Sequence, residues 1–204
     1  MQDPKQNLIA GIETLCLSVD QQMIDQLLSL LQLLQKWNKA FNLTTVTNLQ
    51  KMVVWHLLDS LALSPYINGN RILDVGTGAG FPGLPLAIIN PDQHFVLLDS
   101  TLKKTRFVQQ AILELGIDNV EVVHKRIQDY QPECQFNTVF ARAVSSLADM
   151  VDNVARLVAE DGKILLPKGQ YPYAEIDVLN DCHYSVIKLD IPGMDAQRHL
   201  VSID

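Results

Sequence analysis

Residues 71–83 read Arg-Ile-Leu-Asp-Val-Gly-Thr-Gly-Ala-Gly-Phe-Pro-Gly. The first five form a short apolar run that is typical of a buried strand, and three spaced glycines follow at once. Glycines in such a loop let the backbone turn sharply and approach a ligand closely. This segment therefore predicts a strand that ends in a ligand-binding loop, with a helix opening behind the loop.

The glycine spacing helps to choose among cofactors. Glycine-rich loops bind NAD, FAD and S-adenosylmethionine (SAM), so the glycines alone decide little. Three features favour SAM: the spacing is G-x-G-x-G, Asp74 precedes the first glycine by two residues, and Pro82 stands where the first turn of a helix tolerates proline. We expect this loop to wrap the amino acid and ribose parts of SAM. The predicted contacts are Asp74, Gly76, Thr77, Gly78 and Gly80.

Two later segments supply the other predicted cofactor contacts. Asp99 ends a second apolar run, residues 94–99, where an acid accepts hydrogen bonds from ribose hydroxyls in dinucleotide folds. Its alternative role is to cap the next helix. Ile127 and Gln128 follow a third run, residues 120–124, where such folds place residues beside adenine. The alternative for this pair is ordinary loop packing.

The order of elements indicates an α/β fold with a mostly parallel sheet. Strand-like runs at 71–75, 94–99, 120–124, 137–141 and 162–166 are separated by glycine loops and helical segments. Two further runs have no helix between them and suggest an antiparallel pair at one edge; they cover 183–190 and 198–203. Before the sheet, helices are expected from Asp20 to about Ala40 and from Asn48 to Leu63, with Met52, Trp55 and Leu58 on one side of the second. We expect residues 1–67 to form a helical cap and 68–204 a SAM-binding core, in one compact unit.

The composition limits the classes of protein to which this chain can belong. The 204 residues are 48% hydrophobic and 19% charged, which is typical of a globular chain, and the net charge is −7. That charge argues against a non-specific polyanion binder but allows a local basic groove. The three cysteines are far apart, so neither a disulfide framework nor a metal site is expected. No signal peptide or membrane span is evident, and we expect a cytoplasmic protein.

Several segments of the chain resemble the glucose-inhibited division protein B family, bacterial enzymes that methylate N7 of one guanine in 16S ribosomal RNA. The resemblance runs from about Leu33 to Ser202, and W-N-K-x-x-N-L-T (residues 37–44) with G-F-P-G-x-P (residues 80–85) is far more specific than a general SAM motif. The other segments are His56–Ser60, Leu97–Ser100, Arg142–Ala143, Leu166–Gln170 and Arg198–Val201. Ala79 and Phe81 depart from the family, where proline and leucine are common.

This resemblance implies a Rossmann-like SAM-dependent methyltransferase fold, with a seven-stranded sheet, an antiparallel C-terminal edge and an N-terminal helical cap. The positions matching the family's cofactor contacts are Gly76, Phe81, Ile127, Gln128 and Arg142. The positions matching its basic cleft, and so expected to bind RNA, are Lys103, Arg126, Lys168 and Arg198. The implied partner is 16S rRNA, free or within the small ribosomal subunit or its precursor, and we expect a monomer.

The residues agree with methylation at guanine N7. That atom carries a free lone pair at neutral pH and needs no general base. Arg142 stands where many methyltransferases keep a polar catalytic side chain, and we expect it to position substrate or cofactor rather than to move a proton. Its alternative role is a salt bridge. Because the N7 edge faces a deep, narrow groove in A-form RNA, the target guanine should be unstacked. Candidate stacking partners are Trp37, Phe41, Phe81 and Tyr171, although Trp37 and Phe41 continue an apolar helix face and fit the core better.

Three other functions stay open from the residues alone. A SAM enzyme acting on a small molecule or protein would leave the basic residues without a role. A nicotinamide oxidoreductase would bind NADH and not SAM. A non-catalytic RNA-binding factor would keep the fold and bind RNA without transferring a methyl group.

Overall fold

The computed structural model describes residues 3–141, 147–179 and 183–204. Within these residues, a seven-stranded sheet runs in the order β3-β2-β1-β4-β5-β7-β6. The strands are β1 (Arg71–Val75), β2 (His94–Asp99), β3 (Val120–His124), β4 (Phe136–Ala141), β5 (Val158–Lys168), β6 (Tyr184–Leu189) and β7 (Arg198–Ile203). Each strand run expected from the sequence is present.

The pairing of the strands confirms a mostly parallel sheet with an antiparallel C-terminal edge. The pairs β3-β2, β2-β1, β1-β4 and β4-β5 are parallel, whereas β7 runs antiparallel to both β5 and β6. The chain builds outward from β1 to β2 and β3, then returns to place β4 on the other side of β1. This reversal creates a topological switch point at the carboxyl end of β1, where open α/β sheets bind ligands.

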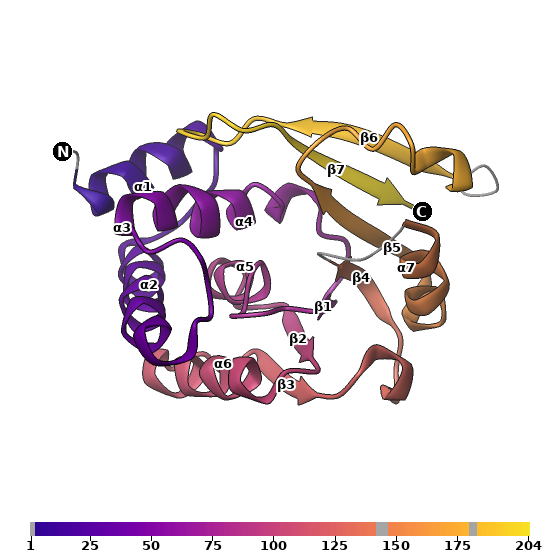
Figure 1. Ribbon diagram of the computed structural model, residues 1–204, viewed down its shortest axis with the longest axis horizontal. Helices are drawn as coiled ribbons and strands as arrows, with labels where there is room; N and C mark the ends of the chain where they lie inside the picture. The colour runs from indigo at the N-terminus through magenta and orange to yellow at the C-terminus, as the bar shows by residue number, and fades with distance from the viewer. Residues whose placement is uncertain (1–2, 142–146, 180–182) are drawn as a thin grey trace.

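The helices cover the two faces of the sheet unequally. Figure 1 shows α1 to α6 on one side of the sheet and α7 on the other. The α-helices are α1 (Pro4–Thr14), α2 (Gln21–Phe41), α3 (Leu49–Met52), α4 (Asp59–Leu61), α5 (Gly83–Ile89), α6 (Leu102–Leu115) and α7 (Leu147–Val154). The short 3-10 and π segments are η1 (Val53–Leu58), η2 (Ser64–Tyr66), η3 (Ile127–Asp129), η4 (Ala155–Leu157) and η5 (Ile176–Leu179). Among the described helices, none combines the length and apolarity that crossing a bilayer requires.

The apolar core lies on both faces of the sheet. Because neighbouring residues of a strand point to opposite faces, Leu97 joins one cluster and Leu98 the other. The first cluster continues without a break from the sheet into α1 and α2, through buried residues such as Leu8 and Leu31. The N-terminal helices therefore share one core with the sheet.

The sequence signals for α2 are confirmed in detail. The Asp20 carboxylate accepts a hydrogen bond from the backbone N–H of Met23 at 2.8 Å, which caps the first turn. Asn42 ends the helix in the left-handed conformation, with φ +49°.

The second expected helix contains a π turn, η1, between α3 and α4. Met52 and Leu58 are buried, as expected, but Trp55 is 38% exposed. A π turn widens the helix, so the ordinary spacing of 3.6 residues no longer predicts which side chains share a face. The prediction that Trp55 shares one side of the helix with Met52 and Leu58 is therefore wrong.

Candidate cofactor cleft at the carboxyl edge of the sheet

A cleft of about 430 Å³ opens at the carboxyl ends of β1, β2 and β3. Its volume is within the range of small-molecule sites. It is lined by Val75, Gly76, Leu98, Asp99, Ser100, Thr101, Lys104, Lys125, Arg126, Ile127 and Gln128. Four of the predicted cofactor contacts, namely Gly76, Asp99, Ile127 and Gln128, are therefore brought together on its walls.

Asp74 shapes the glycine loop from inside. One oxygen of its fully buried carboxylate accepts hydrogen bonds from the Thr77 hydroxyl at 2.7 Å and from the Gly83 backbone N–H at 2.9 Å. The Thr77 side chain is also buried and is oriented toward Asp74 rather than toward solvent. In this structure both side chains therefore brace the loop, and their contact with the cofactor stays a prediction.

The glycines of the loop serve different purposes. Gly78 and Gly80 both have positive φ, +64° and +84°, which side chains rarely adopt. A Cβ on Gly80 would collide with the Leu84 side chain, so Gly80 is needed for packing under α5. A Cβ on Gly78 would meet no atom closer than 3.9 Å. Gly78 thus leaves open space above the loop, where a ligand can approach the backbone.

Asp99 both caps the next helix and faces the cleft. Its Oδ2 accepts a hydrogen bond from the Gly78 backbone N–H at 2.9 Å, and its Oδ1 accepts one from the Thr101 N–H at 2.8 Å. Lys104 Nζ lies 3.7 Å from Oδ2. A carboxylate has about four acceptor positions, so each oxygen keeps capacity for another donor. Both sequence interpretations of Asp99 are thus compatible with one geometry.

The opposite wall of the cleft is the 3-10 turn η3, which Arg156 holds in place. The Arg156 guanidinium donates hydrogen bonds to the carbonyl oxygens of Ile127 at 2.6 Å and Tyr130 at 2.8 Å. Gln128 Nε2 donates to Asn153 Oδ1 at 3.4 Å. Sequence reasoning missed Arg156, because a lone arginine after α7 carries no motif that links it to η3.

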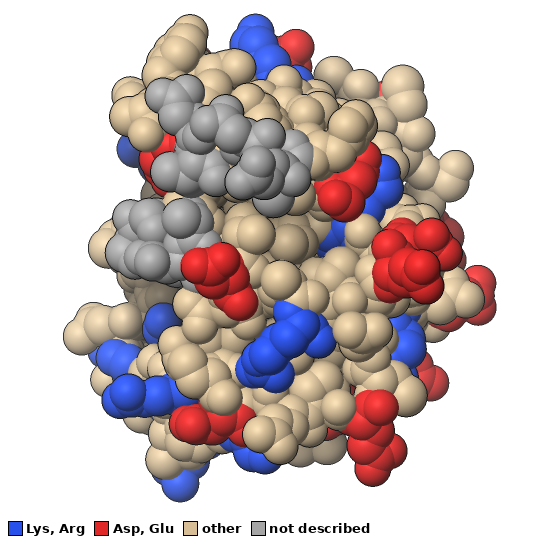
Figure 2. Space-filling view, turned by 90° about the vertical axis from the view of Figure 1, so that its right-hand side faces the viewer, with Lys and Arg blue, Asp and Glu red and all other residues tan. Residues whose placement is uncertain are grey.

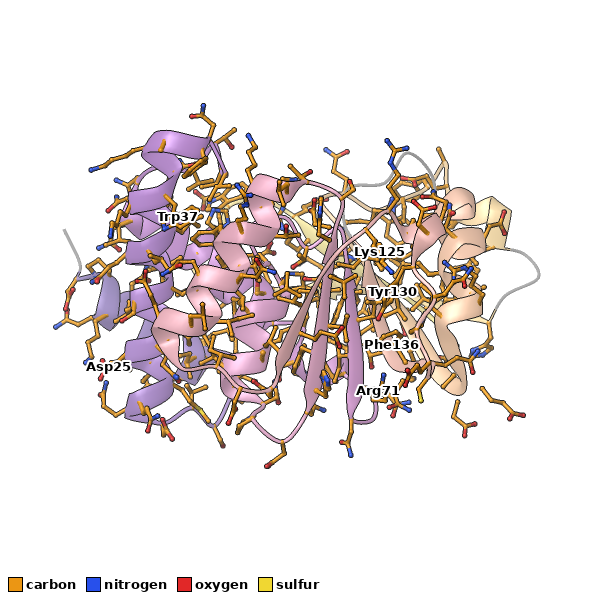
Figure 3. The ribbon with its side chains drawn as sticks, turned by 90° about the horizontal axis from the view of Figure 1, so that it is seen from below. Asp25, Trp37, Arg71, Lys125, Tyr130 and Phe136 are labelled. Carbon is orange, nitrogen blue, oxygen red and sulfur yellow. The ribbon has the colours of Figure 1, made fainter. Side chains whose placement is uncertain are left out.

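Tyr130 follows η3 directly and is buried against Phe136, with ring centroids 6.4 Å apart. Burial raises the pKa of the Tyr130 phenol, and the nearby negative charge of Glu121 raises this pKa further. Figure 3 shows Tyr130 and Phe136 between Lys125, near one end of the strands, and Arg71, near the other.

Phe81 points away from the cleft. It is 7% exposed and stacks on the His56 ring, with centroids 4.9 Å apart and planes 28° apart. His56 Nε2 is in turn 2.9 Å from Thr44 Oγ1. The Phe81 side chain therefore joins the loop to the helical cap, and its contact with the cofactor stays a prediction.

The four basic residues predicted to surround the active site lie in different environments. Arg126 lines the cleft. Lys103 Nζ donates to the Phe41 carbonyl oxygen at 2.9 Å, and Lys168 Nζ pairs with Glu175 at 2.8 Å. Arg198 Nε pairs with Asp59 at 2.9 Å and lies over the Trp55 ring, 5.0 Å from its centroid.

The expectation of one basic rim is thus only partly met. Lys104 and Lys125 join Arg126 on the cleft, but the contacts of Arg198 favour a structural role. Figure 2 shows Lys and Arg gathered toward the lower left of the face that carries α7, with the largest acidic group at the right. Arg142 lies outside the described residues. Within the described residues, no cluster of His, Cys, Asp and Glu could hold a metal ion.

The cleft fits SAM in its chemistry. An acidic acceptor faces the space above Gly78, where a ribose needs a partner. Ile127 and Leu98 offer apolar surface for a purine ring.

Comparison with known proteins also indicates a methyltransferase. The family model for rRNA small subunit methyltransferase G matches residues 23–201. A Psychromonas ingrahamii protein named ribosomal RNA small subunit methyltransferase G is 48% identical over 200 residues, covering 97% of each chain. A Pasteurella multocida protein of the same name is 45% identical, covering 99% of this chain and 97% of that protein.

Solved structures share the fold at low identity. A SAM-dependent methyltransferase from Aquifex aeolicus has a TM-score of 0.56 and 17% identity, covering 71% of this chain and 88% of its own. The Pyrococcus abyssi tRNA (uracil-54, C5)-methyltransferase in complex with S-adenosyl-L-homocysteine has a TM-score of 0.58 and 20% identity, covering 80% of this chain and 40% of its own. These likenesses confirm the Rossmann-like methyltransferase fold. The family model and the two relatives, which match nearly the whole chain, show that it belongs to the rRNA small subunit methyltransferase G family of SAM-dependent methyltransferases.

Proposed function

We propose that this chain transfers the methyl group of SAM to N7 of one guanine in the 16S rRNA of the small ribosomal subunit. The family and its relatives carry an rRNA small-subunit methyltransferase name. The observation that carries the proposal is the cleft, whose walls combine the Asp99 carboxylate with the cations Lys104, Lys125 and Arg126. The acid suits a ribose, and the cations suit a phosphate chain.

The residues of the cleft would hold SAM at distinct points. Asp99 would accept hydrogen bonds from the ribose hydroxyls, and Gly78 would let the ligand approach the backbone beside Gly76. Ile127 would pack on the adenine, with Gln128 next to it. When bound, SAM supplies an electrophilic methyl group.

The polar groups of the cleft favour a nucleophile that needs no deprotonation. Among the described lining residues, Asp99 is the sole carboxylate, and its two oxygens already accept hydrogen bonds from backbone N–H groups. The same lining contains no His or Cys that could act as a general base. Guanine N7 has a free lone pair at neutral pH, whereas a ribose hydroxyl would require a base. Catalysis would then rest on proximity and exclusion of water.

The substrate side of the proposal concerns the rim of the cleft. Lys125 and Arg126 follow β3 directly and would neutralise phosphates near the target. Arg142, which follows β4 in the sequence, would position the guanine or the cofactor through its fixed guanidinium donors. We further propose that the protein acts in the cytoplasm as a monomer.

Methyl transfer from labelled SAM tests the acceptor class. The protein is offered small-subunit RNA from a strain lacking this gene, as naked RNA and as assembled particles, beside the total protein and small-molecule fractions of that strain. We expect label in RNA, and the form that accepts it identifies the recognition unit. Label confined to protein or small molecules would reject the proposed substrate.

A further inference from the structure

A second groove, of about 400 Å³, lies where the end of α2 meets the start of α6. It is lined by Trp37, Phe41, Leu102, Lys103 and Arg106. Phe41 is 42% exposed and Leu102 is 46% exposed. Two large apolar side chains that line the same groove are therefore accessible to solvent. An aromatic groove edged by cations is unusual on a chain whose net charge is −7.

The groove is held in shape by contacts beneath it. The Trp37 ring meets the buried Phe107 edge-on at 5.8 Å and lies 5.1 Å from the Phe41 ring, tilted by 31°. Lys103 Nζ donates to the Phe41 carbonyl oxygen at 2.9 Å and so ties the first turn of α6 to the end of α2. A ligand would therefore meet a preformed surface.

The two segments that line this groove carry basic residues and no acidic ones. The sequence has no Asp or Glu from Gln26 to Leu58, nor from Ser100 to Leu113. These two segments supply the walls of the groove, and Lys103 and Arg106 line it. Lys36 and Lys39 lie beside Trp37 in the sequence, and all four cations are exposed. Lys103 uses one donor on Phe41 and keeps others for a ligand. The surface complements a polyanion that also carries flat apolar rings.

The groove adjoins the cofactor cleft. Thr101 lines the cleft, and its neighbour Leu102 lines the groove, because α6 begins directly after β2. In Figure 3, Trp37 and Lys125 both lie toward one side of the molecule, whereas Arg71 lies toward the other. One extended chain could therefore contact both sites.

We propose that this groove binds an unpaired nucleobase of the RNA that flanks the target guanine. The base stacks on Phe41 and Trp37, while Lys103 and Arg106 neutralise its phosphates. Bases stack on aromatic side chains in single-stranded sites of this composition. The assignment rests on the proposed function, since it extends the same RNA-binding site. It also explains how an unstacked strand is held open for reaction at N7.

Variants of Phe41 test the groove because this side chain is exposed and tolerates change. Phe41→Ala and Phe41→Leu should weaken binding of small-subunit RNA about 5- to 100-fold. Phe41→Tyr keeps a ring and should bind like the parent. Leu113→Ala is the matched control, since Leu113 is 77% exposed at the other end of α6. SAM affinity, measured by calorimetry, should be unchanged in every variant.

Fluorescence gives an independent readout. The chain has two tryptophans, so Trp55→Phe leaves Trp37 as the sole tryptophan reporter. Adding a short single-stranded oligoribonucleotide should quench this emission, and Phe41→Ala in that background should reduce the quenching.

Two results would overturn the assignment: no quenching at saturating oligonucleotide, or wild-type RNA affinity in both Phe41→Ala and Phe41→Leu. If the parent protein methylates rRNA while these variants bind it normally, the groove assignment alone fails. If the parent protein does not methylate rRNA, the proposed function fails, whatever the groove binds.

Discussion

Asp99 and Gly78 are joined by a 2.9 Å hydrogen bond from the Gly78 backbone N–H to Asp99 Oδ2, which links the loop after β1 to the end of β2. The same carboxylate lines the cofactor cleft. Loop position and cofactor recognition therefore depend on one side chain. A change at Asp99 acts on both at once.

Replacing Asp99 with alanine should weaken SAM binding by about 1.5–3 kcal/mol, because a charged hydrogen-bond acceptor is lost. Isothermal titration measures this directly. Asp92→Ala, at an exposed position, removes the same charge away from the cleft and should leave affinity unchanged. Equal affinity in Asp99→Ala and the parent would remove Asp99 from the site.

Gly83→Ala should destabilise the fold by about 1–3 kcal/mol, since a Cβ there would collide with Leu97 and stand 2.9 Å from the Asp74 carboxylate. Gly169→Ala is the control, because its Cβ would meet nothing closer than 4.0 Å. Urea unfolding compares the two. A Gly83→Ala protein as stable as the parent would show that the loop relaxes freely around Asp74.

Arg198→Met should cost about 2–4 kcal/mol of stability, because it leaves the Asp59 carboxylate without this ion pair in a largely buried site. The methionine keeps some packing over Trp55. Lys188→Met breaks the exposed pair with Asp190 and should cost less than about 0.5 kcal/mol. Thermal unfolding measures both. A stable Arg198→Met protein with weakened RNA affinity would instead restore the RNA-binding role predicted from the sequence.

Substitutions of Lys168 and of Glu175 should change RNA affinity in opposite directions. If Lys168 binds phosphate, Lys168→Ala should lower RNA affinity and flatten its salt dependence. Glu175→Gln should then raise RNA affinity, because it releases Lys168 from its 2.8 Å ion pair. SAM affinity should stay constant. If neither variant changes RNA binding in salt titrations, Lys168 serves the structure alone.

Tyr130 makes the fold sensitive to alkaline pH. Burial, reinforced by Glu121, raises its pKa in the folded state above the ordinary value near 10. The unfolded phenol therefore ionises first, and stability is intact below about pH 10 but falls as pH rises toward the folded-state pKa. Tyr130→Phe should lose less stability than the parent over this range. Tyr173→Phe, at a 76% exposed position, should match the parent in urea unfolding at each pH.

Local patterns predicted most of the fold. The strand runs and the helix that starts at Asp20 all appear, because each depends on neighbouring residues. The register of Trp55 could not be predicted, because a π turn interrupts the helix and short-range spacing gives no sign of it. The roles of Arg156 and of the Phe81–His56 stack also escaped prediction, since their partners are distant in the sequence.

The predicted cofactor contacts show the same difference between what neighbouring residues determine and what distant residues determine. Gly76, Asp99, Ile127 and Gln128 line the cleft because strand ends in a parallel sheet meet at one edge. Asp74 precedes its loop by the expected spacing, but it faces inward, and sequence spacing does not tell a buried loop brace from a ligand contact.

Mapping the methylated atom tests the central claim most directly. Small-subunit RNA from a strain lacking this gene is treated with the protein and methyl-labelled SAM, and the RNA is then cleaved chemically at N7-methylguanine. The account predicts one new cleavage site that accounts for the label and disappears without SAM. Label at another atom, or no label in RNA while SAM still binds, would contradict it.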